Sequence, residues 1–282
     1  MTEQTTVWVD GQFFDPNAPT IAPLNHGILV GDGVFETTRV HAGVPFAITR
    51  HLDRLERSAA GIGLTIPDRD TLRAAMLSTV EKSGRSEGRL RLTIVGGVGP
   101  LGSPRGDTPV TTIVAYGPLG TFGPTMRVVT VPWCRNERGA LTGLKTTSYA
   151  ENVVAVEHAR ARGADEAILA NTRDELCEAT AANVFVVLDG VLCTPPLTSG
   201  CLAGITRALV LEGCERAGIA TYEAPMPMSA LTEASEVFVT GSVREIVPVT
   251  HVDDTAVPTA PGPITEGVMA RYADIVNSTP DP

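Results

Sequence analysis

The chain has 282 residues, of which 43% are hydrophobic, and its 22 basic against 32 acidic side chains give a formal net charge of −10. This length and apolar content allow one large domain or two domains of ordinary size. An acidic chain repels phosphate backbones, which argues against nucleic acid as a partner.

The composition argues against other classes of protein as well. No apolar run approaches the roughly 18 residues of a membrane span, and residues 1–14 start polar and then alternate, so neither a membrane nor a secretory signal is expected. The five cysteines are odd in number and form no CxxC pair, which favours reduced thiols in a cytoplasmic protein. The five histidines show no metal-ligand spacing, so no metal site is expected.

The first part of the chain predicts two hairpins and two helices. Residues 5–14 alternate around an Asp-Gly turn, and residues 33–48 do so around a turn at 41–43. Residues 51–64 predict an amphipathic helix ended by glycines, and residues 68–84 predict a second helix, capped by Asp68. The apolar face of the first helix consists of Leu52, Leu55, Ala59 and Ile62. Strands are predicted at 89–97 and 109–117.

The stretch GVGPLG at residues 97–102 satisfies the GxGxxG pattern of dinucleotide-binding proteins. That mechanism requires a helix to open at the motif, with its backbone amides facing the pyrophosphate. Prolines at 104 and 109 oppose a helix here, so residues 96–109 are predicted to form a long, flexible loop rather than a dinucleotide site.

Gly and Pro concentrate in residues 117–125, between two segments with strand patterns, and this predicts a linker. We therefore expect a mixed α/β (α+β) chain with a smaller N-terminal domain (1–118), a linker (119–125) and a larger C-terminal domain (126–282). Within the larger domain the sequence predicts strands at 126–131, 166–170, 176–179 and 236–241, a hairpin at 183–194, and helices at 147–162 and 204–218.

The most specific pattern lies in residues 175–207, ELCEATAANVFVVLDGVLCTPPLTSGCLAGITR. It contains Glu178-x-Thr180-x-x-Asn183-Val184-Phe185, then Leu192-x-Thr194, then Leu202-x-Gly204-Ile205-x-Arg207. This spacing resembles the signature of the class IV aminotransferases, which are fold-type IV enzymes that use pyridoxal 5'-phosphate (PLP). The stretches HGILVGDGVFETTRV, HLDRLERSA, GLKTT, DEAILAN and VFVTGSVREIVPV occur in the order of that family, so the resemblance covers most of the chain.

The resemblance implies that Lys145 carries the Schiff base to PLP and that Glu178 faces the pyridine nitrogen, keeping the ring protonated as an electron sink. Lys145 precedes a predicted helix, where the backbone dipole disfavours an ammonium group. Such a setting, when desolvated, lowers the pKa of a lysine, which suits a nucleophile and proton shuttle better than a structural cation. Tyr149 would lie one helical turn from Lys145 and bind the phenolic oxygen of the cofactor, although a packing tyrosine explains it equally well.

The resemblance also implies a site for the cofactor phosphate. Gly204 permits close approach of the backbone, the amides of Ile205 and Thr206 open a helix, and Arg54 supplies a cation. Leu202 is expected to pack on the ring of the cofactor. Gly241 and Ser242 match the second loop on the phosphate side in this family.

These residues do not decide which reaction follows, because transamination and elimination use the same set. The hypothesis favoured by the resemblance is a 4-amino-4-deoxychorismate lyase of folate biosynthesis, which releases 4-aminobenzoate and pyruvate. The alternative is a transaminase of D-amino acids or branched-chain amino acids. Arg39 and Arg105 are candidates for binding a carboxylate of a small amine or amino-acid-like substrate. The family further implies a homodimer, with residues 24–40 reaching across. Two alternatives without catalysis stay open, a binding module and a protein of this fold that has lost its activity.

Overall fold

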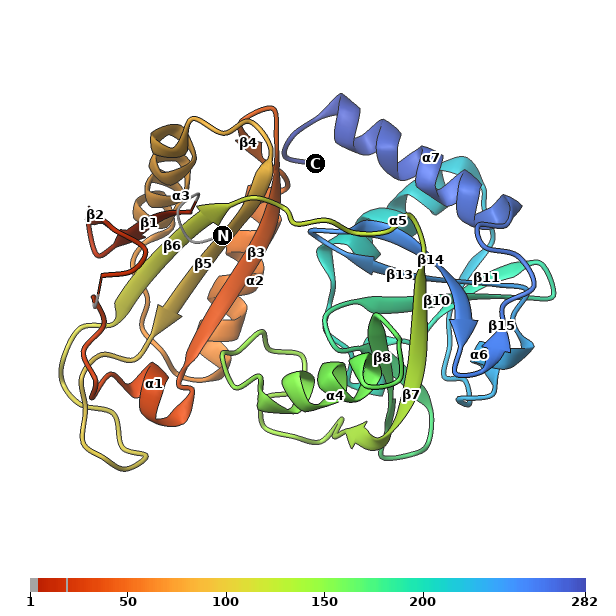
Figure 1. The fold of residues 1–282 in the computed structure, drawn as a ribbon, viewed down its shortest axis with the longest axis horizontal. Helices are drawn as coiled ribbons and strands as arrows, with labels where there is room; N and C mark the ends of the chain where they lie inside the picture. The colour runs from red at the N-terminus through yellow and green to blue at the C-terminus, as the bar shows by residue number, and fades with distance from the viewer. Residues whose placement is uncertain (1–4, 19) are drawn as a thin grey trace. The chain divides into compact units, whose positions relative to one another are not determined.

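The computed structural model describes residues 5–18 and 20–282, which form two compact units (Figure 1). The first unit contains the chain up to Gly120 together with Leu144–Tyr149 and Pro280–Pro282, and the second contains Thr121–Gly143 and Ala150–Thr279. Both units mix helices with strands, which confirms the predicted α/β class. Residues 1–4, at the start of the stretch that argues against a secretory signal, lie outside the described residues.

The described part of the first unit contains an antiparallel six-stranded sheet in the order β2-β1-β6-β5-β3-β4. Its strands are β1 (Thr6–Val9), β2 (Gln12–Phe14), β3 (Gly33–His41), β4 (Val44–Pro45), β5 (Gly88–Val95) and β6 (Thr111–Gly117). Both predicted hairpins are confirmed as β1–β2 and β3–β4. The turn of the first hairpin consists of Asp10 and Gly11, whose φ angles of 43° and 96° give the left-handed conformation that a two-residue hairpin turn requires.

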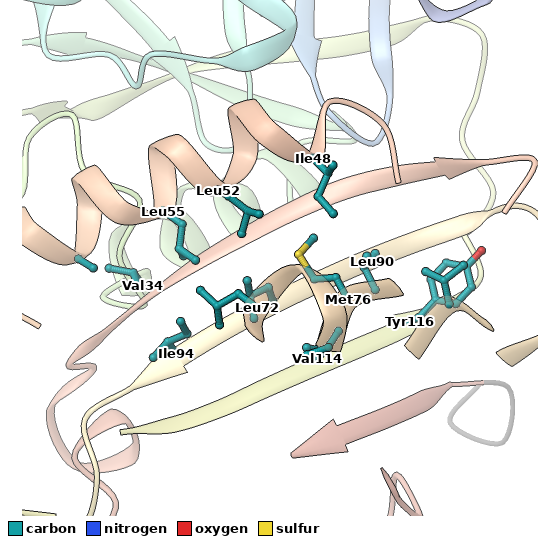
Figure 2. Packing of buried hydrophobic residues seen from close by; sticks show 14 of the residues in the cluster. Val34, Ile48, Leu52, Leu55, Leu72, Met76, Leu90, Ile94, Val114 and Tyr116 are labelled. Atoms are coloured by element: carbon teal, nitrogen blue, oxygen red, sulfur yellow. The ribbon is translucent and has the colours of Figure 1, made fainter. Parts of the chain in front are cut away.

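Helices α2 (Ile48–Gly61) and α3 (Arg69–Ser83) cover one face of this sheet and enclose an apolar core (Figure 2). Strands and helices both contribute fully buried side chains to it, among them Val34, Leu52, Leu55, Leu72, Met76, Leu90, Leu92, Ile94, Val114 and Tyr116. The period of two along β3 directs Val34 toward the helices, so that Phe35 lies on the opposite face.

The ends of the two helices are satisfied in different ways. α3 begins after Asp68, as predicted, because the carboxylate of Asp68 accepts a hydrogen bond from the backbone of Thr71 at 2.9 Å. α2 begins earlier than predicted, at Ile48, and has no local side-chain cap. Its first turn is instead capped by Asp281, whose carboxylate accepts from the backbone and hydroxyl of Thr49 at 2.9 and 2.5 Å.

The segment Leu144–Tyr149 joins the first unit as an extended stretch beside β3. The backbone N–H of Phe35 donates to the carbonyl of Lys145 at 3.1 Å, and the N–H of Thr147 donates to the carbonyl of Gly33 at 2.8 Å. Helix α4 (Ala150–Arg160) begins only afterwards. The prediction that the helix starts near residue 147, with Lys145 at its mouth, is therefore wrong, because backbone pairing with β3 holds these residues extended.

The described part of the second unit is built on a nine-stranded mixed sheet whose main path runs β12-β11-β10-β13-β14-β7-β8-β9, with β15 paired to β14. Its strands are β7 (Met126–Arg135), β8 (Glu166–Asn171), β9 (Leu176–Ala179), β10 (Asn183–Leu188), β11 (Val191–Thr194), β12 (Thr221–Glu223), β13 (Glu236–Gly241), β14 (Glu245–Val252) and β15 (Thr255–Ala256). The predicted hairpin in 183–194 is confirmed as β10–β11.

The remaining helices are α1 (His26–Val30) in the first unit, and α5 (Ile205–Ala217), α6 (Ala230–Glu233), α7 (Pro263–Ser278) and the short 3₁₀ helix η2 (Leu197–Ser199) in the second. α5 confirms the predicted helix at 204–218, and it contacts α7 and strand β13. No helix within the described residues is long and apolar enough to cross a membrane.

The GxGxxG stretch opens no helix, which confirms the loop predicted at 96–109. Within it, Val98 forms an isolated bridge with Asn25. The match to the dinucleotide pattern thus lacks the helical amides that its mechanism needs.

The two leucines of α3 provide a test of this packing. Leu72 is 1% exposed in the core, whereas Leu77 on the same helix is 44% exposed. Leu72→Ala is expected to lower the free energy of unfolding by about 2–5 kcal/mol, because it leaves a cavity between α3 and the sheet. Leu77→Ala is expected to change it by less than about 0.5 kcal/mol. Urea denaturation of both variants measures the difference, and equal losses would contradict the packing described.

Candidate active site

Lys145 is half-buried in the first unit, and its backbone N–H donates to Ser58 Oγ at 3.0 Å. Its Nζ lies 4.4 Å from the centroid of the Phe35 ring and 5.7 Å from that of Tyr149. The two rings meet edge to face, with their centroids 5.2 Å apart. The two rings attract the Nζ group by cation–π interaction and replace part of the water around it.

Tyr149 is thus close to Lys145, but the helical relation predicted between the two residues is wrong. Helix α4 begins at Ala150, so Lys145 and Tyr149 do not share a helical face. They meet because both side chains contact the ring of Phe35.

Arg54 belongs to a buried trio of charged and polar side chains on the helix side of β3. Its Nε and Nη2 donate to Glu36 Oε1 and Oε2 at 2.8 and 2.7 Å. His51, one turn earlier on α2, lies with Nδ1 2.6 Å from Glu36 Oε2. A bidentate contact of this kind fixes the direction of the guanidinium as well as its charge.

The charge state of this trio follows from its surroundings. Burial raises the pKa of Glu36, but the charge and hydrogen bonds of Arg54 and the hydrogen bond of His51 outweigh burial and lower it to about 2. Burial lowers the pKa of His51 more than Glu36 raises it. At neutral pH the trio is therefore an ion pair with a neutral imidazole, whose Nδ1–H donates to the carboxylate.

Glu36 and His51 are not among the residues predicted from the sequence, although a signal for them exists. Glu36 stands between core-facing Val34 and Thr38 on β3, where an acidic residue needs a buried partner. His51 and Arg54 are three residues apart on the predicted helix, which places them on one face.

Arg105, one of the two arginines suggested for binding a substrate carboxylate, anchors the loop that contains it. Its Nε and Nη2 donate to Asp32 at 2.7 and 2.6 Å, and its guanidinium also reaches the carbonyls of Ile62 and Gly63 at 2.8 and 2.5 Å. Asp32 in turn lies 2.9 Å from Nδ1 of His26. Arg39, the other suggested arginine, lies on β3 opposite Arg89 of β5. Their roles toward a substrate stay predictions.

Glu178 lies in the second unit, on β9, and is 8% exposed. Its Oε1 accepts a hydrogen bond from Nε of Arg135 at 3.1 Å, and its Oε2 accepts one from the backbone N–H of Leu202 at 2.9 Å. Two members of the signature, Glu178 and Leu202, are therefore joined directly. Arg135 is not among the residues predicted from the sequence, because it is 43 residues away from Glu178 and belongs to no recognised motif.

The turn before α5 explains further positions of the signature. Asn183 Nδ2 donates to the carbonyl of Leu202 at 2.9 Å. A Cβ atom on Gly204 would lie 1.9 Å from Asn183 Oδ1, so the close approach of these two residues requires glycine. Gly204 stands at the start of α5 and has no side chain that could cap the helix. The backbone N–H groups of the first turn, which contains Ile205 and Thr206, can therefore donate to an anion.

Gly241 is the last residue of β13, and Ser242 directly follows it. Thr240 of the same strand lies opposite Asn183 of β10. The buried hydroxyl of Thr240 has no hydrogen-bond partner within residues 5–18 and 20–282. A buried hydroxyl without a partner is costly, so this hydroxyl is available to a polar group bound from outside the chain.

The candidate residues form two sets, one in each unit. Arg54, Lys145 and Tyr149 belong to the first unit. Glu178, Leu202, Gly204, Ile205, Thr206, Gly241 and Ser242 belong to the second. Within the described ranges, no group of three or more His, Cys, Asp or Glu side chains is arranged to hold a metal ion.

Comparison with known proteins adds an independent observation. The family model "Amino-transferase class IV" matches residues 33–252. A putative branched-chain-amino-acid aminotransferase of Methanocaldococcus jannaschii is 34% identical, covering 95% of this chain and 96% of the relative. A D-alanine aminotransferase of Listeria innocua is 32% identical, covering 92% of each chain.

An aminodeoxychorismate lyase of Bacillus subtilis is 26% identical, covering 94% of this chain and 93% of the relative. Among solved structures, the branched-chain amino acid aminotransferase of Escherichia coli superimposes with a TM-score of 0.90 at 27% identity, covering 96% of this chain and 94% of the other.

The buried trio gives a prediction on stability. Glu36→Gln is expected to lower the free energy of unfolding at about pH 7 by about 3–5 kcal/mol, because it leaves the buried cation of Arg54 without its anion. The folded pKa of Glu36 is depressed from 4.5 to about 2, so the stabilisation is complete above pH 4.5 and is lost as the pH falls through 2. Denaturant titrations at several pH values should show a gap between wild type and variant that narrows below pH 4.5.

The matched control is Glu56→Gln, which breaks an exposed pair with Arg69 at the other side of α2. An exposed pair contributes at most about 1 kcal/mol, so this variant should remain close to wild type. Equal effects of the two substitutions, or a gap for Glu36→Gln that is independent of pH, would refute the assignment of charges in the trio.

Proposed function

Because the chain belongs to the class IV aminotransferase family, we propose that it is an aminotransferase that moves the amino group of a small amino acid to a 2-oxo acid. Enzymes of this family use PLP, which is therefore its cofactor. PLP supplies an aldehyde that binds amines covalently and a ring that withdraws electrons from the carbon next to the nitrogen.

The residues of the chain fit this cofactor in their chemistry. Lys145 offers an amine packed on aromatic rings, and Glu178 offers a carboxylate held by Arg135. The uncapped first turn of α5 and the unpartnered hydroxyl of Thr240 offer donors for a phosphate.

The observation that carries the proposal is the environment of the Lys145 amine. The chain contains two lysines, and the other, Lys82, lies in the last turn of helix α3. Of these two lysines, Lys145 lies against Phe35 and Tyr149, and its charge lowers the pKa of the buried His51. We assign to Lys145 the covalent bond to the cofactor and the transfer of the proton at the reacting carbon.

The other residues have supporting roles in this proposal. Arg54, Ile205, Thr206 and Ser242 bind the phosphate, and Glu178 accepts a hydrogen bond from the ring nitrogen, which keeps that nitrogen protonated. Tyr149 lies close enough to Lys145 to orient the reacting end of the cofactor.

Between the two reactions that the sequence left open, similarity favours transamination. The branched-chain and D-alanine aminotransferases are 34% and 32% identical to this chain, whereas the aminodeoxychorismate lyase is 26% identical. We therefore take transamination as the main reaction and the lyase reaction as the alternative. The homodimer, the role in folate biosynthesis and the cytoplasmic location expected from the sequence stay predictions.

Covalent binding of the cofactor to Lys145 can be tested directly. Borohydride reduction of the protein loaded with PLP should fix the cofactor on the peptide that contains Lys145, as found by mass spectrometry. Lys145→Ala should lose this label and lower amino transfer by at least about 10³-fold, since it removes the nucleophile. Lys82→Ala should retain both properties. A label on Lys82 alone would overturn the assignment.

The two reactions differ in their need for an acceptor. A transaminase should convert D-alanine or L-leucine only when a 2-oxo acid such as 2-oxoglutarate is present, and it should produce one molecule of glutamate for each donor consumed. A lyase should release pyruvate from 4-amino-4-deoxychorismate without any acceptor. We expect the first reaction to have the higher kcat/KM, with both abolished in Lys145→Ala, and the reverse order would establish the lyase.

A further inference from the structure

The carboxylate of Glu178 is held by a closed ring of contacts within the second unit. Nε of Arg135 donates to Glu178 Oε1 at 3.1 Å, and Nη1 of Arg135 lies 3.4 Å from Asn152 Oδ1 on α4. The side-chain amide of Asn152 donates to the carbonyl of Thr180, two residues beyond Glu178. Strand β7, helix α4 and the signature strand β9 therefore position one another through polar groups.

Arg135 reaches Glu178 across an intervening strand. Arg135 lies opposite Asn171 of β8, and Glu178 lies opposite Leu169 of the same strand. Both pairings are irregular close to these residues: the register shifts between Thr130 and Cys134 on one side of β8 and between Leu169 and Ala170 on the other. Such irregularities redirect side chains and are common next to active sites.

Among the charged groups around Glu178, the guanidinium of Arg135 is the one that favours an ionised carboxylate. The side chains of Arg135 and Glu178 are 17% and 11% exposed, so water screens their attraction only in part. The charge of Glu178 also acts on the thiols of Cys177 and Cys201, and burial together with this charge raises the pKa of each thiol, so both stay neutral. Glu151, at the start of α4, lies 3.5 Å from Arg135 and is 80% exposed, which leaves its charge largely screened by solvent.

We propose that Arg135 is a positioning residue that keeps the carboxylate of Glu178 ionised and directed, and thereby sets the protonation of the cofactor ring that Glu178 serves. The last clause rests on the proposed function, whereas the effect on Glu178 belongs to the protein alone. A carboxylate at this burial, deprived of its cation, takes up a proton at higher pH. A protonated Glu178 no longer stabilises positive charge on a ring nitrogen, so electron withdrawal by the cofactor weakens.

The proposal is tested on the full-length protein without cofactor, by NMR titration of protein labelled with ¹³C at the glutamate carboxyl groups. Glu178→Gln identifies the signal of Glu178. In Arg135→Met the midpoint of this signal should rise by roughly one to three pH units relative to wild type, the range expected for losing an adjacent opposite charge. Arg135→Lys, which keeps the charge but loses the planar fork, should remain closer to wild type.

Arg138→Met is the matched control, because Arg138 is three residues further along, is 80% exposed and contacts Glu137 rather than Glu178. Its titration should coincide with that of wild type. An unchanged midpoint in Arg135→Met would overturn the proposal. If that variant does not fold, Arg135→Gln, which keeps a donor and removes only the charge, is titrated in its place with the same two outcomes.

A second readout connects the residue to the reaction. In Arg135→Met loaded with PLP, kcat should fall while KM for the amino donor changes little, because Arg135 touches neither substrate nor the reacting atoms. Arg135→Lys should restore most of the loss. If the titration midpoint of Glu178 shifts but kcat is unchanged, the effect of Arg135 on Glu178 stands, and the link from Glu178 to the cofactor ring is refuted. Failure of the borohydride experiment on Lys145 would instead refute the proposed function.

Discussion

The backbone pairing of residues 145–147 with β3 is the constraint on which the arrangement around Lys145 depends. The chain leaves the first unit after Gly120, builds β7 in the second, and returns to lie beside the edge of β3. Two hydrogen bonds, from Phe35 to Lys145 and from Thr147 to Gly33, fix the register of this return. Because side chains alternate along β3, that register places the ammonium group over Phe35 rather than among the core residues below it.

In each of the two units, an arginine side chain binds a buried carboxylate. The carboxylate of Glu36 accepts hydrogen bonds from Nε and Nη2 of Arg54. The carboxylate of Glu178 accepts them from Nε of Arg135 and from the backbone N–H of Leu202. A buried carboxylate would otherwise become neutral, since its hydration is lost without replacement. In the first unit the ion pair orients a cation that is proposed to meet a phosphate, and in the second it orients an anion that is proposed to meet a ring nitrogen.

The signature of residues 175–207 has a structural basis that goes beyond cofactor chemistry. Gly204 is needed because Asn183 occupies the space that a Cβ atom would take, and Asn183 is in turn bonded to Leu202. The same turn leaves the first amides of α5 uncapped. The motif thus encodes a helix start whose first backbone N–H groups can donate to a bound group. In the loop of Arg105, by contrast, the guanidinium N–H groups donate to Asp32 and anchor the chain.

The sequence by itself determined the features that depend on residues close together in the chain. The hairpins at Asp10 and Asp189, the cap at Asp68, the helix entrance at Gly204 and membership of the family all follow from local spacing. Only the tertiary structure decided that Lys145 lies on an extended segment, that Asp281 caps α2, and that Arg135 reaches Glu178. The physical reason is that these contacts join groups tens to hundreds of residues apart, so they form only once the sheets and helices between them have closed.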